Sequence, residues 1–461
     1  MGCDFYVSAG GNGDGSTPGT PMSIEAALER MYGPGDRMLL NRGDVFYGPV
    51  MPKVEASPDK PFTLGAYGQG ERPRISLIKI IRQSWTDDGD GFYHYNLTDK
   101  TGFDGWKTDS DNVGFIEDSY GVKWGKRMEN AAACKENFDF YCAGGYIRLR
   151  TDKEPFEQLG SLILAINGQS IKLASNMDVE HIHVKYSGGH GIVLQKPGVS
   201  HCRVRNCVIE DIGGARLGTN GWTKYGNGIE YYGGAAHMLV ENNIIRNTFD
   251  VGFTLQGGSI CKWNDIIVRG NVFAYNTQAL EIWTAGTESD QGIDGLTFEE
   301  NICICQGDGW GTPARPDKRG GEGQIKMTDI LVYAYKAPVL RVTIQNNIFY
   351  NPNPDNLVFS VSTKGSAFWE RVISAGNVIY AADFAAICYG TDDTVNDTYG
   401  NLYLTLAQWQ ENTRQDKDTV LIPVYPGRYR YWQVEETARL SCQLKDIFFS
   451  CQQAGISFQK K

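Results

Sequence analysis

The stretch MLVENNIIRNTFDVGFTLQGG, residues 238–258, alternates short apolar runs with polar turns and ends on a glycine pair. Apolar runs of this length, bounded by Asn, Asp and Gly, predict strands rather than helices. Other segments between residues 178 and 380 follow the same pattern: DVEHIHVKYSGGHGIVLQ (178–195), CRVRNCVIEDIGG (202–214), IIVRGNVFAYNTQALEIW (266–283), LTFEENICICQGDGW (296–310), VTIQNNIFYNPNPDNLVFS (342–360) and VISAGNVIY (372–380). Such self-similarity indicates a repeat architecture.

Alignment of these segments puts one position in a common column, occupied by His183, Cys207, Asn243, Asn271, Asn301, Asn347 and Asn377. A strand-turn-strand unit of this size cannot bury its apolar face alone, but stacked units can. An Asn amide both donates and accepts, so stacked Asn side chains can satisfy a tight bend and one another. The sequence therefore predicts an all-β fold, a right-handed parallel β-helix.

The repeat and the regions around it divide the chain into four parts. Residues 1–83 read as an N-terminal cap, with a short helix over about 23–32, followed by the first coils. Residues 84–165, rich in Trp, Tyr and Asp, break the repeat and predict an inserted antiparallel β module. Residues 166–400 form the coils that carry the site, and helical patterns in residues 401–461 predict a segment that closes the far end.

Composition excludes several functions. The net charge of −10 disfavours a nucleic-acid partner, which needs a dense Lys/Arg surface. It also disfavours a strongly anionic substrate, unless a local basic cleft overrides it. No run of about 18 apolar residues predicts a membrane span, and the opening MGCDFYVSAGG lacks the basic and apolar regions of a signal peptide.

The opening YVSAGGNGDGSTPGTP…IEAAL…PGDRMLLNRGDVFYG and the progression GGHGI…NGIEYYGG…DVGFTLQGG…ALEIW resemble bacterial right-handed β-helix proteins that act on carbohydrates. The strongest likeness, over residues 4–400, is to glycoside hydrolases with a β insert after the first coils, such as α-1,3-galactosidases, β-xylosidases and fucosidases. Pectate-lyase-like enzymes and phage tailspikes share the scaffold. The resemblance implies a carbohydrate partner and a secreted, periplasmic or cell-surface location, with any signal peptide already removed.

The candidate catalytic residues come from the second strand of each unit, GIVLQ, GIEYY, GFTLQ and ALEIW. With a period of two, Ile192, Ile229, Phe253 and Leu280 face the core, and the next column, Val193, Glu230, Thr254 and Glu281, faces solvent. Glu230 and Glu281 then lie two strands apart, so their backbones are about 9–10 Å apart. Inverting glycosidases hold their carboxylates ~6.5–9.5 Å apart and retaining ones ~5–5.5 Å apart.

Asp250 enters at the turn before the middle strand and offers a closer carboxylate. We therefore expect Glu230, Asp250 and Glu281 to be catalytic, with inverting geometry favoured. Candidate substrate-binding residues surround them on the same strands and on the long segments 213–228 and 305–324: His190, Arg216, Trp222, Lys224, Tyr225, Tyr232, Gln256, Trp283 and Arg315. Aromatic rings suit the C–H faces of sugars.

Two other functions stay open at this stage. A polysaccharide lyase would abstract a proton beside a uronate carboxylate, with Lys224 or Tyr225 as base and the acidic trio holding calcium. A non-catalytic glycan-binding β-helix would need the aromatic residues but not the carboxylates. Hydrolysis needs no cofactor and no His/Cys/Asp set has metal spacing, so neither a cofactor nor a metal is expected for the favoured function. The oligomeric state is left open.

Overall fold

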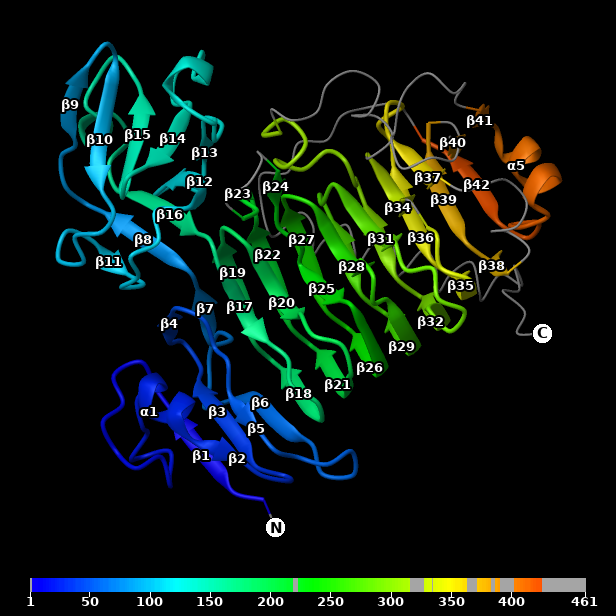
Figure 1. Cartoon of the computed structure of the whole chain (residues 1–461), viewed down its shortest axis with the longest axis horizontal. Helices are drawn as coiled ribbons and strands as arrows, with labels where there is room; N and C mark the ends of the chain where they lie inside the picture. The colour runs from blue at the N-terminus through cyan, green and yellow to red at the C-terminus, as the bar shows by residue number, and fades with distance from the viewer. Residues whose placement is uncertain are drawn as a thin grey trace.

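The computed structural model describes residues 2–218, 223–315, 327–333, 335–362, 371–382, 386–389 and 402–424. In these ranges the chain coils through three long sheets, whose strands stack from one end of the molecule to the other (Figure 1). The pairing within each sheet is parallel, apart from one antiparallel pair at the C-terminal end. The predicted right-handed parallel β-helix is confirmed.

The first long sheet, sheet A, has ten strands. They are β1 (Asp4–Val7), β3 (Arg37–Asn41), β6 (Phe62–Tyr67), β18 (Met177–Glu180), β21 (Val199–Arg205), β26 (Gly234–Glu241), β29 (Lys262–Arg269), β32 (Gly292–Glu299), β35 (Val339–Gln345) and β38 (Val372–Ala375).

The second long sheet, sheet C, also has ten strands. They are β4 (Val45–Tyr47), β7 (Arg74–Ser76), β19 (His183–Ser187), β22 (Val208–Ile212), β27 (Ile244–Thr248), β30 (Val272–Ala274), β33 (Ile302–Ile304), β36 (Ile348–Asn351), β39 (Val378–Ala381) and β42 (Val420–Pro423).

The third long sheet, sheet D, has nine strands and carries the candidate site. They are β17 (Gln169–Lys172), β20 (His190–Leu194), β25 (Ile229–Tyr232), β28 (Val251–Gly257), β31 (Gln278–Thr284), β34 (Thr328–Tyr333), β37 (Leu357–Ser362), β40 (Ala386–Tyr389) and β41 (Leu402–Leu404).

A ladder of asparagines stacks in the turn between sheets A and C. Each of its five Asn side chains is buried, and from Asn243 to Asn347 each Nδ2 donates to the Oδ1 of the next Asn at 3.0–3.2 Å. Asn377 ends the row by donating to Asp416 at 3.1 Å. The predicted ladder is confirmed for these residues.

His183, in contrast, does not belong to that column. Val208 donates its backbone N–H to Ile182, and His183 pairs with Val208, so Ile182 is the residue level with Cys207. The sequence alignment was therefore wrong by one residue in this coil. Ile182 is apolar and fully buried, whereas His183 points outward and contacts Glu210 at 2.9 Å.

Both ends of the solenoid carry a short helix. At the N-terminus, helix α1 (Ile24–Glu29) begins after Ser23, whose hydroxyl accepts from the Ala26 N–H. It is followed by β2 (Met31–Tyr32), which pairs with β5 (Lys53–Val54). Near the C-terminus, α5 (Leu406–Thr413) buries Trp409, whose ring stacks on Phe359 in the core at 4.8 Å. None of the described helices is long and apolar enough to cross a membrane.

An antiparallel module interrupts the first coils (Figure 1). Its two sheets are built from β8 (Ile78–Ile81), β11 (Asp104–Gly105), β12 (Val113–Asp118), β13 (Lys123–Trp124) and β16 (Leu162–Ile166), and from β9 (Thr86–Gly89), β10 (Phe92–Asn96), β14 (Phe140–Ala143) and β15 (Tyr146–Arg150). It also holds the short helices η1 (Ala131–Ala133) and α2 (Pro155–Leu159).

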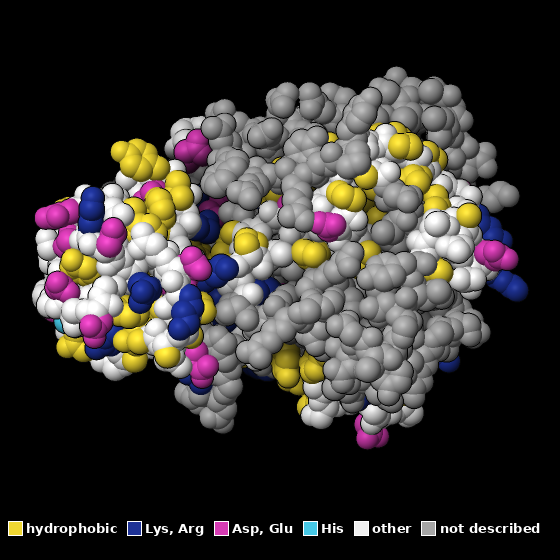
Figure 2. All heavy atoms as spheres, turned by 90° about the horizontal axis from the view of Figure 1, so that it is seen from above, with side chains coloured by type: hydrophobic (Ala, Val, Ile, Leu, Met, Phe, Trp, Pro, Cys, Tyr) yellow, Lys and Arg dark blue, Asp and Glu magenta, His cyan; other side chains and the backbone are white. Residues whose placement is uncertain are grey.

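The module has its own apolar core. Strands β8 and β16 pair with each other where the chain leaves and re-enters the solenoid, so the antiparallel region starts before residue 84. On the face seen in Figure 2, acidic and basic side chains are interspersed over the module at the left. Mixed charge of this kind indicates a solvated surface rather than a binding face of one sign.

Candidate active site

The outer face of sheet D carries the candidate carboxylates in the predicted register. Glu230 pairs with Thr254, and Thr254 with Glu281, so the two glutamates lie in one column with one strand between them. The flanking residues Ile229 and Tyr231 are fully buried in the core of the solenoid. Strands of a sheet lie ~4.8 Å apart, which puts the two glutamate backbones about 10 Å apart.

Glu230 is far more enclosed than its place on an outer face predicts. Its exposed fraction is 2%, so the expectation of a solvated carboxylate was wrong. Its Oε2 accepts from Asn227 Nδ2 at 2.7 Å and contacts His190 Nε2 at 3.1 Å. Its Oε1 takes part in no hydrogen bond among the described residues. Because a buried carboxylate is costly without donors, these two contacts explain how Glu230 is tolerated.

His190, the first residue of β20, is held in one tautomer by its neighbours. The Asn227 backbone N–H donates to His190 Nδ1 at 3.1 Å, so we assign the ring proton to Nε2, which faces Glu230. Burial lowers the pKa of His190, while the charges of Glu230 and Asp250 act in the opposite direction. The imidazole is therefore neutral at pH 7 and donates to Glu230.

Asn227 is the residue that joins these groups, and the sequence analysis missed it. Besides its bonds to His190 and Glu230, its Oδ1 accepts from the Val251 N–H at 3.2 Å, which ties β25 to the next coil. Its position in an Asn-Gly pair indicated a turn and nothing more. Its spacing from Glu230 could have identified it, because a side chain three residues earlier can reach the Glu230 carboxylate across the bend.

Asp250 lies at the turn before β28 and is paired with Arg315. Arg315 Nη2 donates to Asp250 Oδ1 and, at 3.0 Å, to the Phe249 carbonyl, and the guanidinium lies over the Phe249 ring at 4.3 Å. The Asp250 side chain is 23% exposed, whereas that of Arg315 is 4% exposed. Arg315 thus orients the carboxylate rather than reaching into open solvent.

Glu281 is half-buried on β31, and two neighbouring side chains donate to its Oε2. Thr254 Oγ1 donates to Glu281 Oε2 at 2.9 Å, and Gln256 Nε2 donates to the same atom at 2.5 Å. Beside them, Tyr232 is 40% exposed and Trp283 is half-buried, both on the outward side of the sheet. The structure thus brings Gln256, Tyr232 and Trp283 to the same face as the two glutamates.

A two-stranded hairpin, β23 (Ala215–Arg216) and β24 (Lys224–Tyr225), borders the Glu230 end of this face. Tyr225 meets the His190 ring edge-on at 4.6 Å and donates to Asn167 Oδ1 at 2.5 Å. Burial raises the pKa of Tyr225 to about 12. Lys224 is buried, and its Nζ donates to the Ala314 carbonyl at 2.7 Å. Trp222 lies outside the described residues.

The inserted module packs directly against this hairpin. The backbone of Arg216 exchanges two hydrogen bonds with the Asn112 side chain, at 2.9 and 3.1 Å. Trp310, from the segment after β33, contacts Phe115 of the module and Phe249 of the solenoid at ring distances of 4.9 and 5.3 Å. The module therefore forms a wall beside the candidate site.

Chemically, the site combines three carboxylates, a neutral imidazole and exposed aromatic rings on a rigid sheet. Such a set can move protons to and from an oxygen of a bound molecule. Among the described residues, no group of three His, Cys, Asp or Glu side chains is arranged to hold a metal ion.

Comparison with known proteins supports the fold. Residues 163–304 match the family model described as the right handed beta helix region. A search of the curated proteins finds no match.

Among solved structures, similarity is seen to XylC in complex with xylose, at 11% identity over 91% of this chain and 82% of that chain, with a TM-score of 0.47. A lacto-N-biosidase from Eubacterium ramulus matches at 14% identity over 83% and 64%, with a TM-score of 0.36. An alginate lyase from Paenibacillus matches at 11% identity over 88% and 96%, with a TM-score of 0.31.

Proposed function

We propose that the protein is a glycoside hydrolase that cleaves a glycosidic bond by carboxylate acid–base catalysis on the outer face of sheet D. The observation that carries the proposal is the pairing of Glu230 through Thr254 to Glu281, two carboxylates in one column with one strand between them. A backbone spacing of about 10 Å fits the ~6.5–9.5 Å carboxyl separation of inverting enzymes, because side chains can lean toward each other.

In this mechanism Glu230 is the general base. His190 and Asn227 both donate to its Oε2 and fix the side chain in place. The Oε1 atom makes no hydrogen bond with the described residues, and it is the atom that takes a proton from water. The proton of that water passes to Glu230 as its oxygen attacks the anomeric carbon.

Glu281 is the general acid that protonates the leaving oxygen. Thr254 and Gln256 both donate to its Oε2, which fixes the side chain along the sheet. Tyr232 and Trp283 offer ring faces for the sugar units on either side of the cleaved bond. Asp250, held by Arg315, carries charge close to the developing positive charge on the sugar.

A polysaccharide lyase is less well supported. Its candidate bases are both engaged: Lys224 Nζ donates to backbone carbonyls, and the Tyr225 hydroxyl donates to Asn167 with a pKa raised to about 12. A base works best when its pKa lies near the operating pH, so Tyr225 is not suited to proton abstraction at pH 7.

The deciding experiment is a screen of plant and host glycans with two readouts, new reducing ends and ultraviolet absorbance. We expect reducing ends without absorbance, since hydrolysis forms no unsaturated sugar. Proton NMR of the first product should show the inverted anomer. Reducing ends accompanied by absorbance would establish a lyase, and neither signal across the screen would indicate a binding protein.

A further inference from the structure

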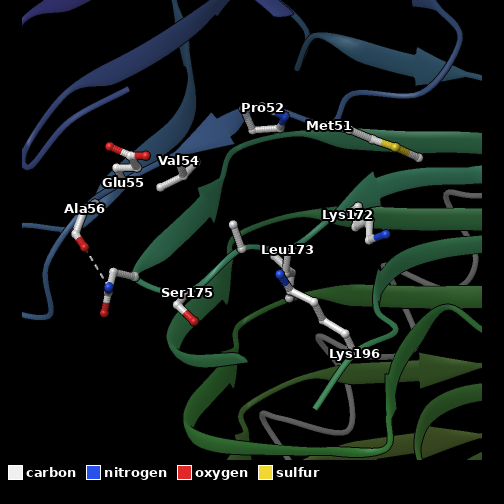
Figure 3. A pocket seen from close by; sticks show the side chains of 11 residues that line it. Met51, Pro52, Val54, Glu55, Ala56, Lys172, Leu173, Ser175 and Lys196 are labelled. Atoms are coloured by element: carbon white, nitrogen blue, oxygen red, sulfur yellow. Dashed lines mark hydrogen bonds between the residues drawn. The ribbon is translucent and has the colours of Figure 1, made fainter. Parts of the chain in front are cut away.

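A pocket of about 400 Å³ lies at the N-terminal end of sheet D, away from the three carboxylates (Figure 3). Its walls are the segment around β5 and the end of β17 with the following turn. Asn176 Nδ2 donates to the Ala56 carbonyl at 2.7 Å and joins the two walls, a bond drawn as a dashed line in Figure 3. A volume of this size can hold one sugar-sized unit of a ligand.

The pocket lies in line with the candidate active site. Lys172 pairs with Val193, and Val193 with Glu230, so Lys172 occupies the same outward column two strands away. That separation is about 10 Å. Val50 forms an isolated parallel β-bridge with Ile171 of β17, so the segment around Val50 lies beside the first strand of sheet D. Lys172 and Glu230 thus lie on one side of sheet D, with the fully buried Val193 between them.

Two lysines give the pocket a positive side. Lys172 is half-buried and Lys196 is exposed, and neither makes an ion pair or a side-chain hydrogen bond among the described residues. Some other lysines are ion-paired: Lys53 contacts Glu29 at 2.9 Å, and Lys262 contacts Asp290 at 2.9 Å.

A single carboxylate also lines the pocket. Figure 3 places Glu55 on the opposite side from the lysines, so it does not neutralise them directly. In a chain with a net charge of −10, these two ammonium groups make the charge of the pocket locally positive.

The remaining lining is apolar. Met51, Val54 and Leu173 present aliphatic or thioether surface to the pocket. An apolar wall facing two cations fits a ring-shaped molecule that carries an anionic substituent, because the ring can pack on the wall while the anion meets the ammonium groups.

We propose that this pocket is a subsite for an acidic sugar unit of the glycan, bearing a carboxylate or a sulfate ester. The inference rests on the proposed function, because it places the acidic unit on the same chain that is cleaved at Glu230. Lys172 and Lys196 bind the anion, and the chain runs across the strands of sheet D. The subsite sets substrate specificity and takes no part in the chemistry.

Binding tests the proposal without any need for turnover. The probes are a glucuronate trisaccharide, its carboxyl-reduced form and a sulfated neutral trisaccharide, each titrated by calorimetry into the wild-type protein. We expect the acidic probe to bind at least about tenfold more tightly than the reduced one, with the preference weakening as salt rises. The sulfated probe tells whether a carboxylate or a sulfate is preferred.

The matched variants are K172Q and K196Q, singly and together, with K60Q as the control. Lys60 is an exposed lysine of the N-terminal coils that does not line the pocket. The double variant should lose the preference for the acidic probes and keep the affinity for the reduced one, while K60Q should match wild type. Equal binding of acidic and reduced probes by wild type, or an unchanged preference in the double variant, would overturn the subsite.

Kinetics then separate this proposal from the hydrolase itself. On an acidic substrate the double variant should raise KM about tenfold with kcat unchanged. If wild type hydrolyses only neutral glycans, the subsite fails and the hydrolase stands. If no glycan is cleaved while the lysine-dependent binding persists, the hydrolase fails and the anion site stands.

Discussion

The solenoid buries polar side chains in two very different ways. In the ladder between sheets A and C, five asparagines repeat with one geometry, and each amide is satisfied by its neighbours. At the corner of sheet D, Glu230, His190 and Asn227 form a cluster that is not repeated in the other coils as far as the structure describes them. The ladder is neutral, and the cluster contains a buried carboxylate.

The difference separates stability from function. A neutral amide that donates and accepts can be buried without loss, so it can recur in every coil. A carboxylate in the same environment costs free energy even when two donors reach it, so its burial inside a candidate site favours a functional role. We therefore expect substitutions in the ladder to act on folding, and those in the cluster to act on catalysis.

The largest expected effect is that of E230Q. Glutamine keeps the shape but cannot take a proton, so kcat should fall by about 10²–10⁴-fold. The urea midpoint should stay level or rise, because a buried charge is removed. The matched control E241Q changes a glutamate of sheet A that pairs with Arg269, and its kcat should equal that of wild type. An active E230Q enzyme would remove Glu230 from the mechanism.

Next comes N271A, which tests the ladder. Asn271 donates to Val240 and Asn301 and accepts from Asn243, all at 2.9–3.0 Å and fully buried. Its loss leaves several buried groups unpaired, so the free energy of unfolding should fall by about 3 kcal/mol. Urea denaturation measures this, with N264A, a half-buried surface position, as the control. A loss of kcat with unchanged stability would mean that the ladder serves catalysis rather than folding.

A smaller effect is expected at Asp329, a buried carboxyl whose oxygens lack a hydrogen bond of ordinary geometry. Burial raises the pKa of Asp329 well above its usual value, so the folded protein holds a proton that the unfolded chain releases above pH 4. Wild-type stability should fall as the pH rises from about 4, by about 1.4 kcal/mol for each unit of pKa difference.

The variant D329N removes that penalty. Its stability should exceed that of wild type at pH 7, and the two should converge toward pH 3–4. Urea unfolding across this pH range measures the difference. A variant that is less stable than wild type at neutral pH would mean that the carboxylate has a partner worth keeping.

N227A should lower kcat about tenfold, because Glu230 loses one of its two donors and the bond that ties β25 to the next coil. A merely structural role would lower stability alone. The diagnostic readout is therefore the split between kcat and KM in the folded variant: a positioning role lowers kcat and leaves KM unchanged. An unchanged kcat would make Asn227 a structural residue.

The smallest effect is expected from Y231F. The Tyr231 hydroxyl is buried without a hydrogen-bond partner in the described structure, so its removal should stabilise the protein by up to about 1 kcal/mol. Y32F is the matched comparison, because the buried Tyr32 hydroxyl donates to the Ala27 carbonyl at 2.9 Å. That variant should lose about 1 kcal/mol. Thermal unfolding of both variants should show shifts of opposite sign.

Periodicity made most of the fold predictable. The columns through Ile229 and Glu230 follow from alternation along each strand, and their register holds across four coils. The error at His183 arose where two His flank Ile182, because the polar pattern there imitated the ladder position. Burial of the Ile182 side chain sets the register of this coil. The sequence of one coil alone predicts that burial only weakly.

The candidate site was less predictable, because its residues meet through bends and insertions rather than through the repeat. Alternation gives the direction in which Glu230 points but not its 2% exposure. Likewise, the pairing of Arg315 with Asp250 joins segments 65 residues apart, and no local pattern predicts it. Asn227 was hidden by its resemblance to an ordinary turn residue.

One consequence follows from the stacking of strands in sheet D. The backbones of Glu230 and Glu281 are two strand spacings apart. This distance changes by about 4.8 Å each time one complete coil is gained or lost between them. Loss of the coil that contains β28 would bring the two glutamates onto adjacent strands, near the shorter separation used by retaining enzymes. In a solenoid of this kind, the stereochemical course of hydrolysis could thus be inherited or exchanged through the gain or loss of a single repeat.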